Sequence, residues 1–285
     1  MDKKHFTFLA VIVLLCNACE KTLEFDIPES KPLLVVNSFI TNGDFIKVEV
    51  SSSLSYLDPL SEIPVISGAE ISLTGEGTSF NLIESESISG TYYSQEPVSN
   101  EGTYNVQVAA EGLKTVNAST IIPSAVNGEV ELLGNTESEY EFRLTFDDVP
   151  NSEDYYHLML IKFSETWPEG DIHEFRSNDE ILLSSGADFS FEEDNYYYDS
   201  AVFKDDLFEN SQASIRFKTD FWEEEVDYKL QLIRSSREYF DYHQSYRAFQ
   251  NSGGPFSQPV QVYTNIDNGI GVFGGYSFIE IPLEY

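Results

Sequence analysis

The segment Phe45-Ile46-Lys47-Val48-Glu49-Val50-Ser51 is the clearest sign of the architecture of this 285-residue chain. Its three aliphatic residues occupy every second position between polar or aromatic ones. In an extended strand this period of two places the aliphatic side chains together on one face. The turn signal Asn42-Gly43 separates the segment from an apolar run at residues 33–40. Two neighbouring strands are therefore predicted.

The same pattern continues along the first half of the chain. Residues 102–108 (Gly-Thr-Tyr-Asn-Val-Gln-Val) alternate again, and further strand signals occupy residues 68–75, 79–83 and 113–120. Short glycine-containing turns separate these segments. Short strands at such spacing are typical of a β-sandwich. We predict an N-terminal Ig-like β-sandwich domain over residues 33–124.

A larger β-rich domain is predicted over residues 125–285. Residues 140–147 alternate like a half-buried strand, whereas Tyr155–Phe163 is almost uniformly apolar and reads as a central strand. Residues 165–195 are rich in Gly, Ser, Asn and acids, and are expected to form long loops with at most short strands. Further strand candidates are residues 196–198, 214–219 and 228–233.

One helix is predicted in this second domain, at residues 236–251. Ser235 and Glu238 have the spacing of a capping box, and glycines with Pro255 end the segment. Aromatic rings recur at helical spacing, which favours packing of the helix onto the second sheet over an aromatic platform for a ligand. These rings belong to Tyr239, Tyr242, His243, Tyr246 and Phe249.

The glycine-rich C-terminal stretch contains a second strong turn signal. Asn268-Gly269 is typical of a two-residue hairpin, because both residues tolerate positive φ. Val272-Phe273 lies between glycines, where another backbone can approach closely. A closing hairpin is the first expectation, and an exposed strand edge that docks a receptor is the second.

The N-terminus has the pattern of a lipoprotein signal peptide, residues 1–18. Lys3 and Lys4 precede an apolar stretch at residues 6–16, and Ala18 stands directly before Cys19. The stretch is too short to span a bilayer, which needs roughly 20 apolar residues. We expect Cys19 to be lipidated and residues 19–32 to form a polar tether. Ordinary secretion of a cleaved protein is the weaker alternative.

The chain is strongly acidic, with 16 basic against 49 acidic residues and a net charge of −33. Such a charge repels nucleic acid, so no nucleic-acid partner is expected. The acidic runs are interpreted as solvated surface, although two runs brought together by the fold could bind calcium; no run has the spacing of a calcium loop. No metal site and no cofactor are predicted. The runs are Asp147–Asp148, Glu192–Asp194, Asp205–Asp206 and Glu223–Glu225.

No catalytic motif is recognisable. The chain has no Gly-Xaa-Ser-Xaa-Gly elbow, its two cysteines both lie within the first 19 residues, and the histidines His157, His173 and His243 have no zinc-helix spacing. A non-catalytic protein is therefore predicted. Because the many acids could meet in pairs, a glycan hydrolase is kept as a less favoured alternative.

Two further surface features are predicted from short motifs. Tyr196, Tyr197 and Tyr198 stand among acidic residues, and successive strand residues point to opposite faces, so they are the candidate aromatic patch for ligand binding. Asp199-Ser200-Ala201 is similar to an O-glycosylation acceptor of Bacteroidetes, which would place Ser200 on an exposed loop.

Five segments of the chain together carry a resemblance to a known family. They are Cys19-Glu20-Lys21, residues 32–37, residues 236–240, residues 255–259 and residues 262–276. With these segments the chain resembles the Bacteroidetes outer-membrane lipoproteins of domain-of-unknown-function family 4249. These proteins are often encoded near TonB-dependent receptors, so the resemblance implies an accessory role in uptake, with outer-membrane lipid and a TonB-dependent receptor as partners. The resemblance implies no catalytic residues.

The predicted protein is thus a mainly β, lipid-anchored binding or accessory module in the cell outer membrane. Its orientation, facing the periplasm or the cell surface, is left open. A surface adhesin or structural envelope protein is the alternative function.

Overall fold

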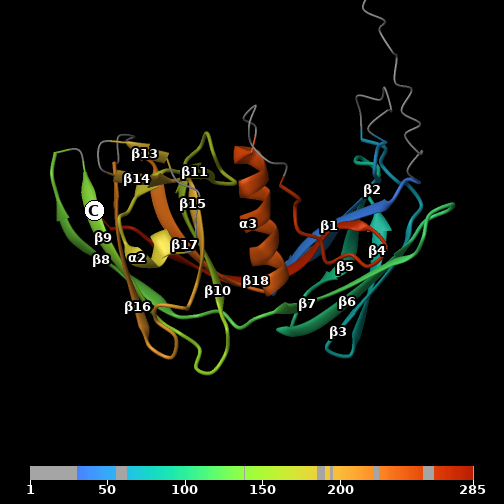
Figure 1. Ribbon diagram of the computed structural model, residues 1–285, viewed down its shortest axis with the longest axis horizontal. Helices are drawn as coiled ribbons and strands as arrows, with labels where there is room; N and C mark the ends of the chain where they lie inside the picture. Colours follow the sequence, from blue (N-terminus) through green and yellow to red (C-terminus); the bar gives the residue numbers. More distant parts are fainter. Residues whose placement is uncertain are drawn as a thin grey trace, which may run out of the picture. The chain divides into compact units, whose positions relative to one another are not determined.

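The computed structural model describes residues 31–55, 63–137, 139–184, 190–192, 195–220, 225–252 and 260–284 (Figure 1). The protein is mainly β, as predicted. Residues 32–285 form one compact unit. The predicted signal peptide, Cys19 and residues 19–30 of the tether lie outside the described residues. No helix in the described part of the chain is both long and apolar enough to cross a bilayer.

Seven strands make up the N-terminal half, and the predicted alternation is confirmed in β2 (Phe45–Ser52). There Ile46, Val48 and Val50 are buried, while Lys47 and Glu49 face solvent. The other strands are β1 (Leu34–Thr41), β3 (Glu70–Gly75), β4 (Thr78–Glu84), β5 (Thr91–Pro97), β6 (Gly102–Ala109) and β7 (Val116–Ile122).

The second half contains eleven described strands and two described helices. The predicted strands at residues 140–147 and 155–163 are β9 (Tyr140–Asp147) and β10 (Tyr155–Phe163). The expected loop region holds a short helix as well, α2. The remaining elements are β8 (Gly128–Asn135), β11 (Asp171–His173), β12 (Phe175–Arg176), α2 (Glu180–Ser184), β13 (Ser190–Glu192), β14 (Asn195–Tyr198), β15 (Ser200–Lys204), β16 (Gln212–Thr219), β17 (Asp227–Ser235), α3 (Arg237–Asn251) and β18 (Ile270–Pro282).

The strands form two sheets. The larger has the order β11-β10-β17-β18-β1-β2-β5-β4-β3-β6-β7, with β15 also paired to β10, and the smaller has the order β13-β14-β12-β16-β9-β8. Strand β18 lies inside the larger sheet, parallel to β1 and antiparallel to β17. The two expectations for the C-terminal stretch, a closing hairpin and an exposed edge, are therefore wrong.

Glycines in β18 allow this central position. A Cβ on Gly275 would collide with the backbone of Ile121 in β7, and one on Gly271, which has a φ of +112°, would collide with the carbonyl oxygen of Val36 in β1. The close approach of another backbone, expected from the glycines around Val272-Phe273, is thus present. Long-range pairing with β1 replaces the local hairpin that Asn268-Gly269 suggested.

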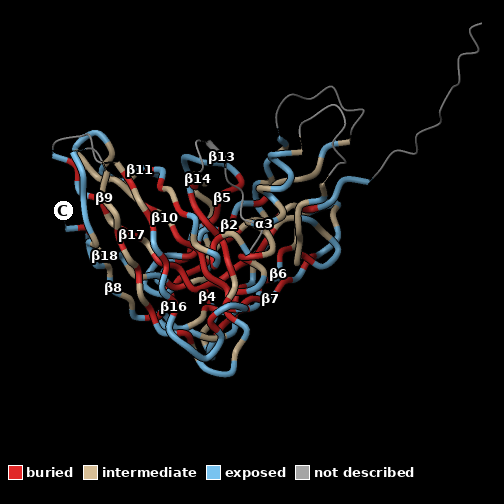
Figure 2. Tube along the Cα trace, turned by 60° about the vertical axis from the view of Figure 1, so that its left-hand side comes forward, coloured by how far each residue is buried: buried red, intermediate tan, exposed pale blue. Residues whose placement is uncertain are grey.

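The described residues form two large hydrophobic cores, one in each half of the sequence, and a small cluster of Tyr155, Val202 and Phe240. Figure 2 colours the buried residues red. One large core is built from β1–β7 together with Ile266 and Phe273, and the other extends from Val126 to Leu283. Strand β18 contributes side chains to both cores, because Phe273 is in the first core while Ile279 packs against the second. The boundary between two domains at residue 124 stays a prediction.

Helix α3 begins one residue later than predicted, and its cap differs. The N-cap is Ser236, whose Oγ accepts the N–H of Tyr239 at 3.2 Å. Ser235 belongs to the end of β17, so the predicted capping box of Ser235 and Glu238 is wrong. The Glu238 carboxylate instead accepts the hydroxyl of Thr120 at 3.2 Å, which ties the start of the helix to β7.

The aromatic stripe of α3 packs in its first half and is exposed in its second. The ring of Tyr239 lies 5.1 Å from that of Phe39 in β1 and 5.5 Å from that of Tyr276 in β18. Tyr246 and Phe249, by contrast, are 40% and 51% exposed. The packing interpretation therefore holds for the first turns of the helix, which contact the larger sheet.

Candidate functional site

The outer face of the smaller sheet brings several cationic side chains close together, among acidic ones. In β16 the residues Ile215 and Phe217 point into the core, so the alternate residues Arg216 and Lys218 point outward. Arg176 of β12 joins this face beside Lys218, its register partner. With Arg143, the register partner of Arg216 on β9, four of the 16 basic residues of the chain thus lie on one face of the sheet.

Three of these cations, Arg176, Arg216 and Lys218, line a pocket of about 290 Å³. Arg176 is held in place by Glu139, at 3.2 Å, and by Asp220. Lys218 donates to Glu139 at 2.9 Å. The full lining is Glu141, Arg176, Ser177, Asn178, Asp179, Arg216, Phe217 and Lys218.

Two charged groups of this pocket have no partner within the described part of the chain. They are the guanidinium of Arg216 and the carboxylate of Glu141, whose backbones lie on the neighbouring strands β16 and β9. A guanidinium binds carboxylate or phosphate through two parallel hydrogen bonds, and a carboxylate accepts hydroxyl or ammonium donors. The pocket is therefore suited to a small polar ligand that carries an anionic group and at least one donor.

The three predicted tyrosines do not form one surface patch. Tyr197 is half-buried and lies over the Arg176 guanidinium, with 5.7 Å between the ring centroid and Cζ. Tyr196 packs against the second core. Tyr198 is fully buried and stacks on Phe175 at 5.4 Å, so its prediction as a surface residue is wrong. The alternation along β14 turns Tyr197 away from its two neighbours.

Ser200 is not on an exposed loop. It is the first residue of β15, pairs with Met159 of β10 and is 7% exposed. Ser200 is drawn into the strand because the residues that follow it, Ala201, Val202 and Phe203, are core residues. A glycosyltransferase would need this hydroxyl at the surface, and the fold does not present it there.

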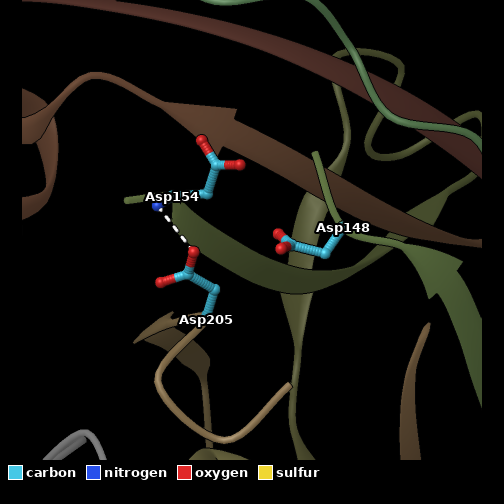
Figure 3. Close-up of side chains that lie close together, drawn as sticks. All are labelled: Asp148, Asp154 and Asp205. Atoms are coloured by element: carbon cyan, nitrogen blue, oxygen red, sulfur yellow. Dashed lines mark hydrogen bonds between the residues drawn. The ribbon is translucent and has the colours of Figure 1, made fainter. Parts of the chain in front are cut away.

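Two of the acidic runs do meet in the fold. Asp148 follows β9 and Asp205 follows β15, and Asp154, just before β10, joins them (Figure 3). Carboxylate oxygens of all three lie within 4.8 Å of one another, and all three residues are buried. The other two runs reach beyond the residues whose side chains the structure describes.

Hydrogen bonds hold each of these carboxylates. The Asp154 carboxylate accepts hydrogen bonds from Nε and Nη2 of Arg234, at 3.0 and 2.6 Å. Asp148 accepts the Tyr156 hydroxyl at 2.9 Å, and Asp205 accepts the backbone N–H of Asp154 at 3.0 Å. The cluster thereby joins the connection between β9 and β10, which carries Asp148 and Asp154, to the end of β15 and, through Arg234, to β17.

The charges of this cluster do not balance, because three carboxylates face one guanidinium. Burial, followed by the negative charges of Asp148 and Asp154, raises the pKa of the Asp205 carboxyl. Oxygen ligands of this kind suit Ca²⁺ or Mg²⁺, and these are the residues that could hold a metal ion. Either a cation or a proton on Asp205 lowers the repulsion.

A second buried polar group lies between α3 and the larger sheet. Nδ1 of His157 in β10 is 2.9 Å from the hydroxyl of Tyr239, and its ring is 5.3 Å from that of His243. Burial, with the charges of His243 and Arg247, lowers the pKa of His157 well below its usual value. Burial, followed by Arg247, lowers the pKa of His243 to about 4. Both rings are therefore neutral at physiological pH.

Sequence reasoning missed Asp154 and Arg234, although one signal was present. Arg234 ends an apolar strand, where an arginine with 7% exposure needs a buried anion. It also missed the pocket, because Arg176 and Arg216 are 40 positions apart and become neighbours only through pairing of β12 with β16.

Comparison with known proteins defines the class to which this β-rich fold belongs. The chain belongs to the family described as "Domain of unknown function (DUF4249)", whose model matches residues 20–280. No curated protein matches the chain.

Some solved structures are distantly similar. Bovine butyrophilin is 8% identical with a TM-score of 0.21, covering 90% of this chain and 100% of that one. The Yersinia pseudotuberculosis adhesin InvE is 15% identical with a TM-score of 0.21, covering 70% and 55%. Salmonella alpha-2-macroglobulin is 11% identical with a TM-score of 0.25, covering 90% and 15%. At these TM-scores the similarities carry neither fold nor function over to this chain.

Proposed function

We propose that the protein is a non-catalytic lipoprotein of the bacterial outer membrane that binds a ligand and serves as an accessory module of a TonB-dependent uptake system. The observation that carries the proposal is the position of Cys19. It follows a basic and apolar leader pattern, the family match begins at residue 20, and the compact unit begins at residue 32. Acyl chains on this cysteine anchor the folded part through the intervening segment.

The pocket beside Tyr197 is the ligand site that fits this role best. It combines a guanidinium and a carboxylate that have no partner among the described residues with an arginine that Glu139 and Asp220 already hold in position. Fixed polar groups around a concave site give orientation and specificity to a small ligand. An anionic nutrient with hydroxyl or amino groups meets these requirements.

The first test is a mild-detergent pull-down of the tagged protein from native membranes, with mass spectrometry of its partners. Stoichiometric recovery of a TonB-dependent receptor supports the uptake role. Recovery of the protein alone, together with binding to host or matrix molecules, overturns it in favour of an adhesin.

The anchor is tested separately with a Cys19→Ser variant. The wild-type protein should partition into the detergent phase of a Triton X-114 extract, and the variant into the aqueous phase. Equal partitioning of the two proteins contradicts the lipid anchor.

A further inference from the structure

Four segments that are distant in sequence lie side by side where β1 begins. The Ser53 N–H donates to the carbonyl oxygen of Leu33 at 2.8 Å, and the Ser52 N–H donates to that of Pro64 at 2.9 Å. On the same stretch of β2, the Val50 N–H donates to the carbonyl oxygen of Gly90 at 2.8 Å. The start of β1, the end of β2 and the segments around residues 64 and 90 therefore form one end of the N-terminal half.

This end exposes aliphatic side chains from every one of the four segments. We call the set the tip surface. On β2 itself, by contrast, the aliphatic residues Ile46, Val48 and Val50 are buried. The tip surface consists of Leu33 (41% exposed), Leu54 (37%), Ile63 (68%), Val65 (54%) and Ile88 (53%).

The tip surface is also poor in charge. In the described segments 31–33, 51–55, 63–67 and 84–90 the charged side chains are Lys31, Glu84 and Glu86, and most other polar residues are serines. The Glu84 carboxylate accepts the backbone N–H groups of Gly90 and Gly68, at 2.9 Å each. The whole chain is 23% charged, with a net charge of −33, so these segments carry less charge than the chain as a whole and an anionic lipid surface repels them less.

The covalent chain brings the same end toward the anchor. Leu33, which belongs to the tip surface, is fourteen positions after Cys19. Because a residue spans at most about 3.6 Å, acyl chains on Cys19 stay within roughly 50 Å of Leu33 in any conformation of the intervening segment. No other exposed aliphatic group in the described part of the chain is connected to the anchor so directly.

We infer that the tip surface rests on the lipid bilayer that holds the acyl chains, with its aliphatic side chains in the interfacial region. Exposed apolar area gains about 25 cal/mol per Å² when it leaves water, and the anchor removes most of the entropic cost of reaching the membrane. The bilayer thus orients the protein, because the smaller sheet with its pocket belongs to the other half of the sequence. This inference rests on the proposed lipid anchor.

The test attaches the protein to lipid by a route that does not need acylation. The chain from residue 20 onward, with an N-terminal hexahistidine tag, is bound to phosphatidylcholine vesicles that contain a nickel-chelating lipid. This chain has no cysteine, so Val65→Cys carries the single environment-sensitive fluorophore. The matched control is Ile121→Cys, on β7, with a similar exposure of 53%.

On vesicle binding, the label at position 65 should shift its emission to shorter wavelength and be quenched by nitroxide lipids, while the label at position 121 should not change. An unchanged label at position 65 overturns the inference. A shift at position 65 that depends on protein concentration and needs no vesicles also overturns it, because a second copy then covers the surface. Since the tag replaces the acyl chains, these results are independent of whether Cys19 is lipidated.

Discussion

The Nη2 atom of Arg234 lies 2.6 Å from Oδ1 of Asp154, and both side chains are buried. This pair connects the end of β17 with the start of β10, and Arg234 also donates from Nη1 to the hydroxyl of Ser124 at 2.8 Å. Ser124 belongs to the segment between β7 and β8. The guanidinium therefore fixes the point at which the chain passes from its first core to its second.

Removing the anion of this pair should be strongly destabilising. In an Asp154→Asn variant Arg234 stays buried without a counter-charge, and the expected loss is about 3–5 kcal/mol in the free energy of unfolding. Urea denaturation followed by tryptophan fluorescence measures it. A loss below about 1 kcal/mol would show that Asp148 or Asp205 replaces Asp154 as the partner.

Removing the charge of the neighbouring Asp205 carboxylate should, by contrast, stabilise the folded protein. Because the folded state raises the pKa of Asp205, its negative charge opposes folding above that pKa. Asp205→Asn should therefore unfold at higher urea than the wild type at pH 7, and the gain should shrink as the pH falls and vanish below 3.8, where the carboxyl becomes protonated in both states. A variant that is less stable only when calcium is present would instead show that the three carboxylates hold a cation.

One glycine of β18 and one glycine of β8 give a matched pair of substitutions. Gly275→Ala places a methyl group against the backbone of Ile121, which cannot retreat without moving β7, so a loss of about 1–3 kcal/mol is expected. Gly134→Ala in β8 meets no atom within 4 Å and should change stability by less than about 0.5 kcal/mol. Thermal unfolding of both variants compares them, and equal melting temperatures would contradict the close approach.

Stability should also fall in mild acid because of the histidines beside α3. The pKa of His243 is lowered to about 4 in the folded state, so the unfolded chain binds a proton first as the pH drops below 6.5. The free energy of unfolding should decrease between pH 6.5 and about 4, by at most about 1.4 kcal/mol per pH unit for each histidine. His243→Phe keeps a ring on Phe39 and should flatten this dependence. An unchanged slope would show that His243 is solvated.

The pocket is tested by separating binding from stability. Arg216→Ala removes a side chain without a partner in the described structure, so the melting temperature should stay close to that of the wild type. Among dicarboxylates and sugar acids, at least one should stabilise the wild type and not this variant. Arg143→Ala is the control, because Arg143 lies opposite Arg216 on β9, outside the pocket lining. Ligands that stabilise all three proteins equally would place the site elsewhere.

Local patterns predicted local structure well and long-range pairing poorly. The alternation at residues 45–51 gave the correct faces of β2, because burial of one face depends only on strand periodicity. Asn268-Gly269 favoured a hairpin for an equally local reason, but the hydrogen bonds of β18 go to β1, more than 200 positions earlier. No periodicity in a single sequence encodes such a partner.

The candidate sites show the same difference between local features, which the sequence predicted, and long-range contacts, which it did not. The acidic runs at residues 148 and 205 suggested that two runs might meet, and they do, although Asp154 of the pair Glu153-Asp154, which the sequence analysis did not single out, completes the group. Tyr196, Tyr197 and Tyr198 were correctly expected to point to both faces of a strand. Their packing depended on Phe175 and Arg176 of β12, which the composition of the loop region gave no reason to place there.

The position of β18 has a consequence for the order in which the protein can be assembled. It is the last of the described elements along the chain, yet it fills the space between β1, the first of them, and β17. A chain that emerges from its N-terminus exposes the edge of β1 until residues 270–282 arrive, so neither core can close during synthesis. Late closure is compatible with the proposed export, because a sheet that cannot form before residues 270–282 are available leaves the chain unfolded while it is threaded through a translocation channel.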